Sequence, residues 1–111
     1  MNRFAIASGI ATGTTGWLPA VRVGGEAIPL QSLHALAEGT TPAFDIELWI
    51  TTEERDGEPF GFWKLEPNLV GSSTTEFPTE ATEGYLFDAP FLWIRPRVVS
   101  LTGTLSIWGI V

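Results

Sequence analysis

The sequence contains no cysteine, and it has only one histidine and one methionine among its 111 residues. Without cysteine the chain can form neither disulfides nor thiolate–metal sites. No apolar run approaches the roughly twenty residues that a membrane-spanning helix needs, so we expect no membrane partner. The apolar run from Phe4 to Ile10 is short and contains Ser8 and Gly9, and we therefore expect no cleaved signal peptide.

Basic residues are also few. Six Lys and Arg stand against thirteen Asp and Glu, which gives a formal net charge of −7. Binding to nucleic acid through counterion release needs a basic face, so we expect no nucleic-acid partner. An acidic surface suits solubility, or a basic partner.

Residues that favour strands and turns are abundant. Val, Ile, Thr, Trp and Phe are frequent, and twelve Gly and eight Pro are scattered through the chain. With six to eight short strands separated by turn signals, this composition predicts an all-β fold. We expect a single-domain antiparallel β-sandwich, jelly-roll-like, or a small barrel, over residues 1–111.

The last twenty-one residues, 91–111, organise this prediction. Two apolar runs flank Thr102 and Gly103, which predicts a hairpin with a two-residue loop. In that register Pro96 lies opposite Gly109, and its missing N–H points away from the partner towards an edge or a bulge. The predicted core side holds Ile94, Val98, Leu105 and Ile107, and the other side holds Trp93, Arg95, Arg97, Ser106 and Trp108.

Residues 43–52 form the clearest strand of the first half. One side carries Phe44, Ile46, Leu48 and Ile50, and the other carries Asp45, Glu47, Trp49 and Thr51. Asp56-Gly57 then predicts a two-residue hairpin loop. The resulting pairs are Glu53 with Phe60, Thr51 with Phe62 and Trp49 with Lys64. This register places Trp63 and Leu65 on the core side and Phe60 and Phe62 on the outer side.

The remaining segments are less regular. Strands are expected at residues 4–11, 17–23 and 85–88, with Pro19 at an edge or a bulge. Residues 28–38 fit a two-residue alternation about as well as a short helix, and we expect at most one or two helical turns near 31–38, capped by Ser32. Residues 66–84 are polar and predict a long loop that is ordered mainly by a neighbouring chain.

Little in the sequence points to catalysis. His34 has no spacing that ties it to a nucleophilic serine or a second metal ligand, and we expect it to be structural. Carboxylates at the predicted turn could hold a hard cation such as calcium, but they match no known loop spacing, and we favour a solvated tip. They are Glu53, Glu54, Asp56 and Glu58. We therefore expect no enzyme activity, no cofactor and no metal.

Aromatic residues that face away from the predicted core are the main functional signal. Contiguous apolar patches of several hundred Å² usually mark an interaction surface. The candidate interface consists of Trp49, Phe60, Phe62, Trp93, Arg95, Arg97 and Trp108. Arg95 and Arg97 on one hairpin, with Asp45 and Glu47 on the other, make it complementary to a copy of itself or to a mixed-charge neighbour. The alternatives are inverted faces, or loops that cover these rings.

Three stretches, 4–19, 44–57 and 90–111, combine short strands, Thr/Gly turns and an aromatic–Arg strand. In this they resemble small β-sandwich structural proteins of tailed-phage virions. Size and acidity are most similar to those of capsid decoration (cement) proteins. The resemblance implies a non-enzymatic protein, made in the host cytoplasm, that lies on the outer capsid surface of the virion. There it would form oligomers, with a trimer favoured, and brace neighbouring major capsid subunits.

Two other functions remain open. One is a carbohydrate-binding β-sandwich module in which Trp49, Trp93 and Trp108 form a sugar-stacking platform. The other is a tail or neck component of the virion. A sugar platform needs coplanar rings open to solvent, whereas a cement protein buries such rings between chains.

Overall fold

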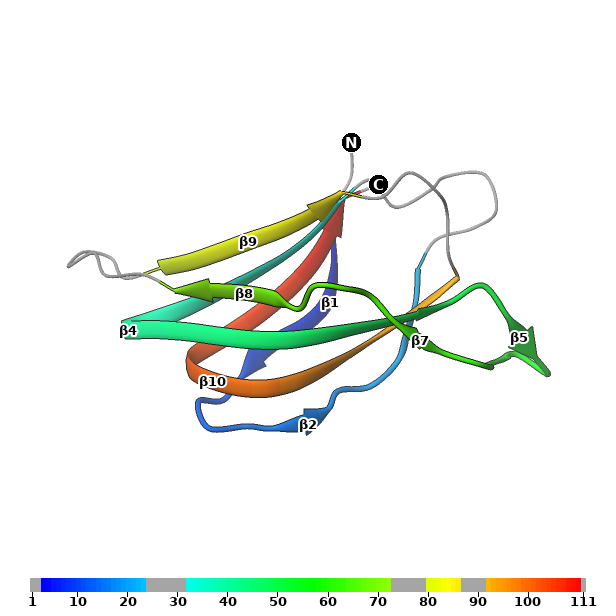
Figure 1. Ribbon diagram of the computed structural model, residues 1–111, viewed down its shortest axis with the longest axis horizontal. Coiled ribbons are helices and arrows are strands. Elements are labelled where there is room, and N and C mark those ends of the chain that lie inside the picture. The colour runs from blue at the N-terminus through cyan, green and yellow to red at the C-terminus, as the bar shows by residue number, and fades with distance from the viewer. Residues whose placement is uncertain (1–2, 24–31, 73–79, 87–91, 111) are drawn as a thin grey trace.

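Two long strands dominate the fold (Figure 1). The computed structural model describes residues 3–23, 32–72, 80–86 and 92–110. Strand β4 (Ser32–Thr51) pairs antiparallel with β10 (Trp93–Ile110) along almost its whole length, from Ser32 opposite Ile110 to Thr51 opposite Trp93. At about 3.3 Å per residue, a straight β4 would extend about 66 Å. The molecule measures only 45 Å along its longest axis, so both strands must bend.

The bend is a corner in the middle of both strands. Glu38 pairs with Thr104 and Ala43 pairs with Thr102, so residues 39–42 lie opposite Gly103 alone. Such an irregularity tilts the strand and raises its local twist. Each half of the pair then belongs to a different layer of a sheet that is folded over on itself.

Shorter strands extend the sheet on both sides. Three of them pair with β10: β1 (Arg3–Ile10), β2 (Gly16–Trp17) and β3 (Val21–Arg22). Another three pair with β4: β7 (Trp63–Lys64), β8 (Leu69–Ser72) and β9 (Glu80–Leu86). Strands β5 (Glu54–Arg55) and β6 (Glu58–Pro59) form a separate hairpin at the end of the long axis opposite the corner (Figure 1).

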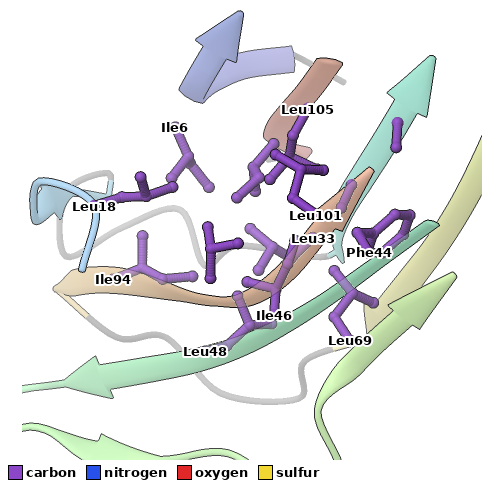
Figure 2. Packing of buried hydrophobic residues seen from close by; sticks show 14 of the residues in the cluster. Ile6, Leu18, Leu33, Phe44, Ile46, Leu48, Leu69, Ile94, Leu101 and Leu105 are labelled. Atoms are coloured by element: carbon purple, nitrogen blue, oxygen red, sulfur yellow. The ribbon is translucent and has the colours of Figure 1, made fainter. Parts of the chain in front are cut away.

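One hydrophobic core fills the space inside the folded sheet (Figure 2). Alternate residues of both long strands point into it, on either side of the corner. They meet Ile6 of β1, Leu18 and Val23 beside β2 and β3, and Leu69 of β8. The long strands contribute Leu33, Ala35, Ala37, Phe44, Ile46, Leu48, Ile50, Ile94, Val98, Leu101, Leu105 and Ile107.

The predicted all-β class is confirmed. The described residues form antiparallel strands and no helix, and hence none long and apolar enough to cross a membrane. The sandwich arises from one folded sheet rather than from two stacked ones. The helical alternative for residues 31–38 is wrong from Ser32 onward, because pairing with β9 and β10 places this segment in the sheet centre. Residues 28–31 lie outside the described part.

The predicted terminal hairpin is wrong. Residues 93–110 form one strand that passes through Thr102 and Gly103, and both halves pair with β4 instead of with each other. Pro96 accordingly lies opposite Leu48, not Gly109. The Pro96 carbonyl accepts a hydrogen bond from Leu18 N at 2.9 Å. The N–H and C=O of one residue point to the same side of an antiparallel strand, so the missing N–H of Pro96 faces β2 and β3. The pairing of β10 is interrupted there, between Trp17 of β2 and Val21 of β3.

The prediction of a long polar loop at residues 66–84 is also wrong. It contains β8 and the first part of β9, both paired with β4. Residues 73–79 lie outside the described part, and the expectation that a neighbouring chain orders this segment remains a prediction. By contrast, the Asp56-Gly57 hairpin is confirmed: Glu54 pairs with Pro59, Arg55 with Glu58, and Trp49 with Lys64.

Candidate functional site

The outer side of the β4–β10 pair carries most of the predicted interface residues. Buried neighbours such as Leu48 and Ile94 fix the inward side of each strand. Residues between them must point outward, because successive side chains in a strand alternate. Trp49, Trp93, Arg95 and Arg97 therefore lie opposite the core, and each is half-buried. Their predicted sides are correct.

A cluster of five side chains forms where β2 meets this pair. In the register, Arg97 lies between Trp17 on β2 and Glu47 on β4, and Arg95 lies opposite Trp49. We call Trp17, Glu47, Trp49, Arg95 and Arg97 the Trp17 cluster. The Trp17 and Trp49 rings meet edge to face, with centroids 5.3 Å apart and an interplanar angle of 63°.

Trp17 is the ring around which this cluster is built. The Arg95 guanidinium lies over it at 4.4 Å from the ring centroid, and that of Arg97 at 5.8 Å. Both distances fall within the range of cation–π attraction. Even so, Trp17 remains 45% exposed. The sequence placed Trp17 in a strand without indicating its face, because β2 is two residues long and shows no alternation.

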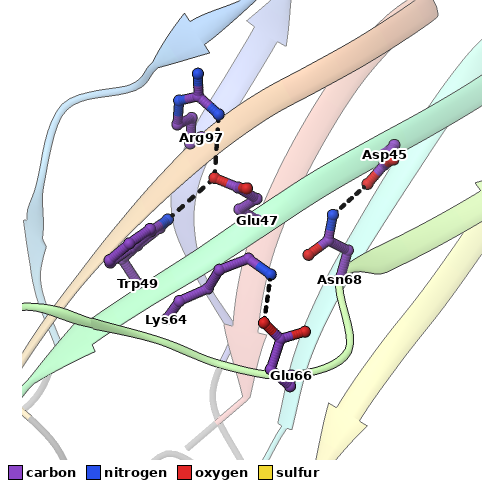
Figure 3. Close-up of polar contacts among 7 residues, drawn as sticks. All are labelled: Asp45, Glu47, Trp49, Lys64, Glu66, Asn68 and Arg97. Carbon is purple, nitrogen blue, oxygen red and sulfur yellow. Dashed lines mark hydrogen bonds and ion pairs between the residues drawn. The ribbon is translucent and has the colours of Figure 1, made fainter.

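Glu47 ties the two sides of the cluster together (Figure 3). One oxygen, Oε1, accepts a hydrogen bond from Trp49 Nε1 at 3.2 Å and one from Arg97 Nη1 at 3.2 Å. The Trp49 hydrogen bond and then Arg97 hold the pKa of Glu47 below its ordinary value, while partial burial acts in the opposite direction. Glu47 is therefore a charged cross-strand clamp.

The other charged groups near this cluster have partners of their own. Lys64 Nζ lies 2.7 Å from Glu66 Oε1, and Asn68 Nδ2 donates to Asp45 Oδ1 at 2.8 Å (Figure 3). Arg95 differs: within the described residues it forms no ion pair, and its guanidinium lies on the face of Trp17. Among the described side chains, the cluster thus presents one cation without an ion-pair partner, and this cation lies on an exposed ring.

Trp93 is held by the base of the β5–β6 hairpin. Its Nε1 donates to Glu54 Oε1 at 2.9 Å, and Arg22 Nε donates to the same oxygen at 3.0 Å. These hydrogen bonds, Arg22 first and then Trp93, lower the pKa of Glu54, while burial opposes them. Trp93 is therefore partly covered by its own chain.

Trp108 belongs to a separate group beyond the corner. Its ring stacks on His34 at 5.6 Å with an interplanar angle of 21°, and the Arg3 guanidinium lies 4.2 Å from its centroid. His34 Nε2 also lies 2.9 Å from Ser32 Oγ. The predicted interface is therefore divided between the two halves of the sheet. It does not form one platform of Trp49, Trp93 and Trp108.

The remaining predicted aromatics lie along the β5–β7 segment. Phe60 is exposed beneath the Arg55 guanidinium, which is 3.7 Å from the ring centroid, and Phe62 is half-buried. Trp63 shares the inward side of its partner Ile50, as predicted, but is 45% exposed instead of lying in the core. The reason is that β7 is an edge strand two residues long, beyond the reach of the opposite layer.

The carboxylates of the acidic turn do not converge on one cation site in the described structure. Glu54 is drawn away towards Arg22 and Trp93, while Glu53, Asp56 and Glu58 are exposed. Among the described residues, no group of three or more His, Asp or Glu side chains is arranged to hold a metal ion.

Comparison of the chain with protein-family models, with curated proteins and with solved structures found no match.

Proposed function

We propose that this protein is a non-enzymatic structural component of a tailed-phage virion, with the role of a capsid decoration protein. It would assemble with copies of itself, with a trimer favoured, and with the major capsid protein on the outer capsid surface. The observation that carries the proposal is the Trp17 cluster, in which an exposed tryptophan and two arginines lie on a sheet face outside the core. The phage context comes from the sequence resemblance.

The composition of this cluster favours protein–protein contact. Tryptophan and arginine are enriched among the residues that contribute most to binding at protein interfaces. The rings are held in place before binding, because Trp49 is fixed by Glu47 and Trp17 by its contacts with Trp49 and Arg95. A surface ordered in advance loses less side-chain entropy on association.

The carbohydrate-binding alternative has less support from this geometry. A sugar stacks on an open ring face, but Arg95 covers one face of Trp17. The 63° angle between Trp17 and Trp49 prevents the two rings from forming a flat platform, and Trp108 lies in the other half of the sheet.

The test is the mass of the purified protein in solution, alone and mixed with capsids that lack it. We expect an oligomer that binds such capsids. Trp17→Ala should weaken self-association or capsid binding at least about thirtyfold, since an interface anchor typically contributes about 2 kcal/mol. Trp63→Ala is the matched control, because Trp63 has the same 45% exposure but lies on the other side of the sheet.

The outcomes separate the two functions. Equal binding by both variants and the wild type would contradict the role of the Trp17 cluster. The carbohydrate-binding alternative would be favoured by three results together. The protein would be a monomer that does not bind capsids, a soluble polysaccharide would quench its tryptophan fluorescence, and this quenching would be absent in Trp49→Ala.

A further inference from the structure

Within the part of the chain that the structure describes, Arg95 is the one charged member of the Trp17 cluster that forms no ion pair. Glu47 is engaged by Arg97, Glu54 by Arg22 and Glu66 by Lys64. Arg95 instead lies 4.4 Å over Trp17, which orients its guanidinium without neutralising it. An arginine held on an aromatic face has donors free for a carboxylate.

The same chain carries carboxylates, which are opposite in charge to Arg95, at the protruding tip of the β5–β6 hairpin. The β5–β6 hairpin turns at Asp56 and Gly57, whose φ angles of +53° and +80° are those of a tight type I′ turn. Glu53, Asp56 and Glu58 are exposed there, and within the described residues none of them forms an ion pair. Arg55, the only cation of the hairpin, is folded back over Phe60. The tip therefore presents three carboxylates that no described cation pairs with.

The hairpin of one molecule is directed away from its own Trp17 cluster. Its base is fixed to the sheet by the Glu54 contacts with Trp93 and Arg22, and the turn extends beyond this point, clear of the sheet (Figure 1). Glu54 is thus used within the chain, whereas the carboxylates further out are available to a second molecule.

We propose that the acidic hairpin tip of one copy docks onto Arg95 and Trp17 of a second copy. This proposal rests on the proposed function, because it names the partner of the same cluster. Opposite charges on a rigid protrusion and a rigid face are complementary, and complementary charge determines orientation and partner choice at interfaces. The contact uses different surfaces on the two copies, so repeating it closes a ring, such as a trimer, or builds a chain.

Two variants test this arrangement. The face variant is Arg95→Gln, which keeps much of the side chain over Trp17. The tip variant combines Glu53→Gln, Asp56→Asn and Glu58→Gln, and asparagine at position 56 preserves the turn because it also tolerates positive φ. Glu38→Gln is the control, since Glu38 is an exposed carboxylate at the far corner. Circular dichroism and thermal unfolding check that each variant is folded.

Sedimentation over a range of concentrations gives the oligomeric state. We expect the wild type and Glu38→Gln to self-associate, more weakly as salt is raised, and each of the two other variants to lose at least about tenfold in affinity. The decisive sample is an equal mixture of the face and tip variants. One intact tip and one intact face remain per pair, so the mixture should form a dimer and nothing larger.

Other results would overturn the docking model. A wild type that stays monomeric would do so, as would a tip variant that assembles like the wild type. A tip variant that assembles normally while Trp17→Ala and Arg95→Gln do not would leave the proposed function standing, with a face-to-face contact instead. If neither Trp17→Ala nor Arg95→Gln affects assembly or capsid binding, the proposed function fails as well.

Discussion

Gly103 lies at the corner on which the folded sheet depends, and replacing it by alanine tests that corner directly. Its φ is +99°, a backbone conformation that side-chain-bearing residues rarely adopt. A Cβ atom built there would lie 2.7 Å from the carbonyl oxygen of Glu38 and 3.4 Å from Cβ of Pro42. Neither contact is with the end of a flexible side chain. Backbone on both long strands would have to move.

Two contributions determine how much Gly103→Ala should lower the free energy of unfolding. A non-glycine residue in a left-handed conformation costs about 1–2 kcal/mol. Forcing an extra carbon into a packed position costs about 1–3 kcal/mol more. We therefore expect Gly103→Ala to lower the free energy of unfolding by about 2–5 kcal/mol.

Gly13→Ala separates these contributions. Gly13 has φ +81°, but apart from its two neighbours in the chain no described atom lies within 4 Å of the position that a Cβ would take. It should therefore lose only the backbone part, about 1–2 kcal/mol. Both variants reduce the entropy of the unfolded chain equally, so this effect cancels in the comparison.

Denaturant unfolding followed by tryptophan fluorescence measures both variants, with the slope of each transition checked for a change in the surface exposed. If Gly103→Ala costs no more than Gly13→Ala, the close contact between Gly103 and Glu38 does not exist in solution. The strand would then not pass through this corner as described, and the predicted hairpin loop at Thr102 and Gly103 would regain support.

Substitutions at three further residues have defined outcomes. Ile107→Ala should destabilise by about 2–5 kcal/mol in denaturant unfolding, since Ile107 is only 1% exposed, and a change below about 0.5 kcal/mol would contradict its place in the core. For Glu47, whose pKa is lowered in the folded state, the stabilisation is complete above the ordinary glutamate pKa and is lost as the pH falls through the folded value. The stability difference between wild type and Glu47→Gln should therefore shrink as the pH falls below the ordinary glutamate pKa, and a constant difference would refute the clamp. Trp93→Ala should cost about 1–2 kcal/mol, between a surface and a core change, because the ring is half-buried and donates to Glu54. Trp93→Phe keeps an aromatic ring but loses the hydrogen bond and part of the packing area, so in thermal unfolding it should be less destabilising than Trp93→Ala.

The sequence was sufficient to predict which side of residues 44–50 and of residues 93–108 faces the core, but not which side of residues 32–38 does, since there Leu33, Ala35 and Ala37 are buried instead of Leu36. Alternation has a period of two whatever strand lies next to it, so Ile94 and Ile107 are correctly inward although their predicted partners were wrong. The Asp56-Gly57 hairpin was predictable for a similar reason, because a two-residue turn and its register are encoded locally.

Long-range pairing was not predictable in this way. Glycine next to threonine suits a hairpin loop and also suits a corner within one strand, and pairing with residues 32–51 decides between them. For residues 32–38, leucine, alanine and glutamate favour a helix locally, but this preference amounts to tenths of a kcal/mol per residue. Burying Leu33 and Ala35 between β9 and β10 outweighs it.

The pairing also changes what the charged residues of the outer face can do. Placed on two separate hairpins, Arg97 and Glu47 would be available to complement another molecule symmetrically. In the structure they are cross-strand neighbours and form an ion pair within one chain. Among the described residues, Arg95 has no ion-pair partner on this face, and Glu53, Asp56 and Glu58 have none at the hairpin tip. A chain whose surplus charges of opposite sign lie on different surfaces is better suited to a head-to-tail contact than to a symmetric one.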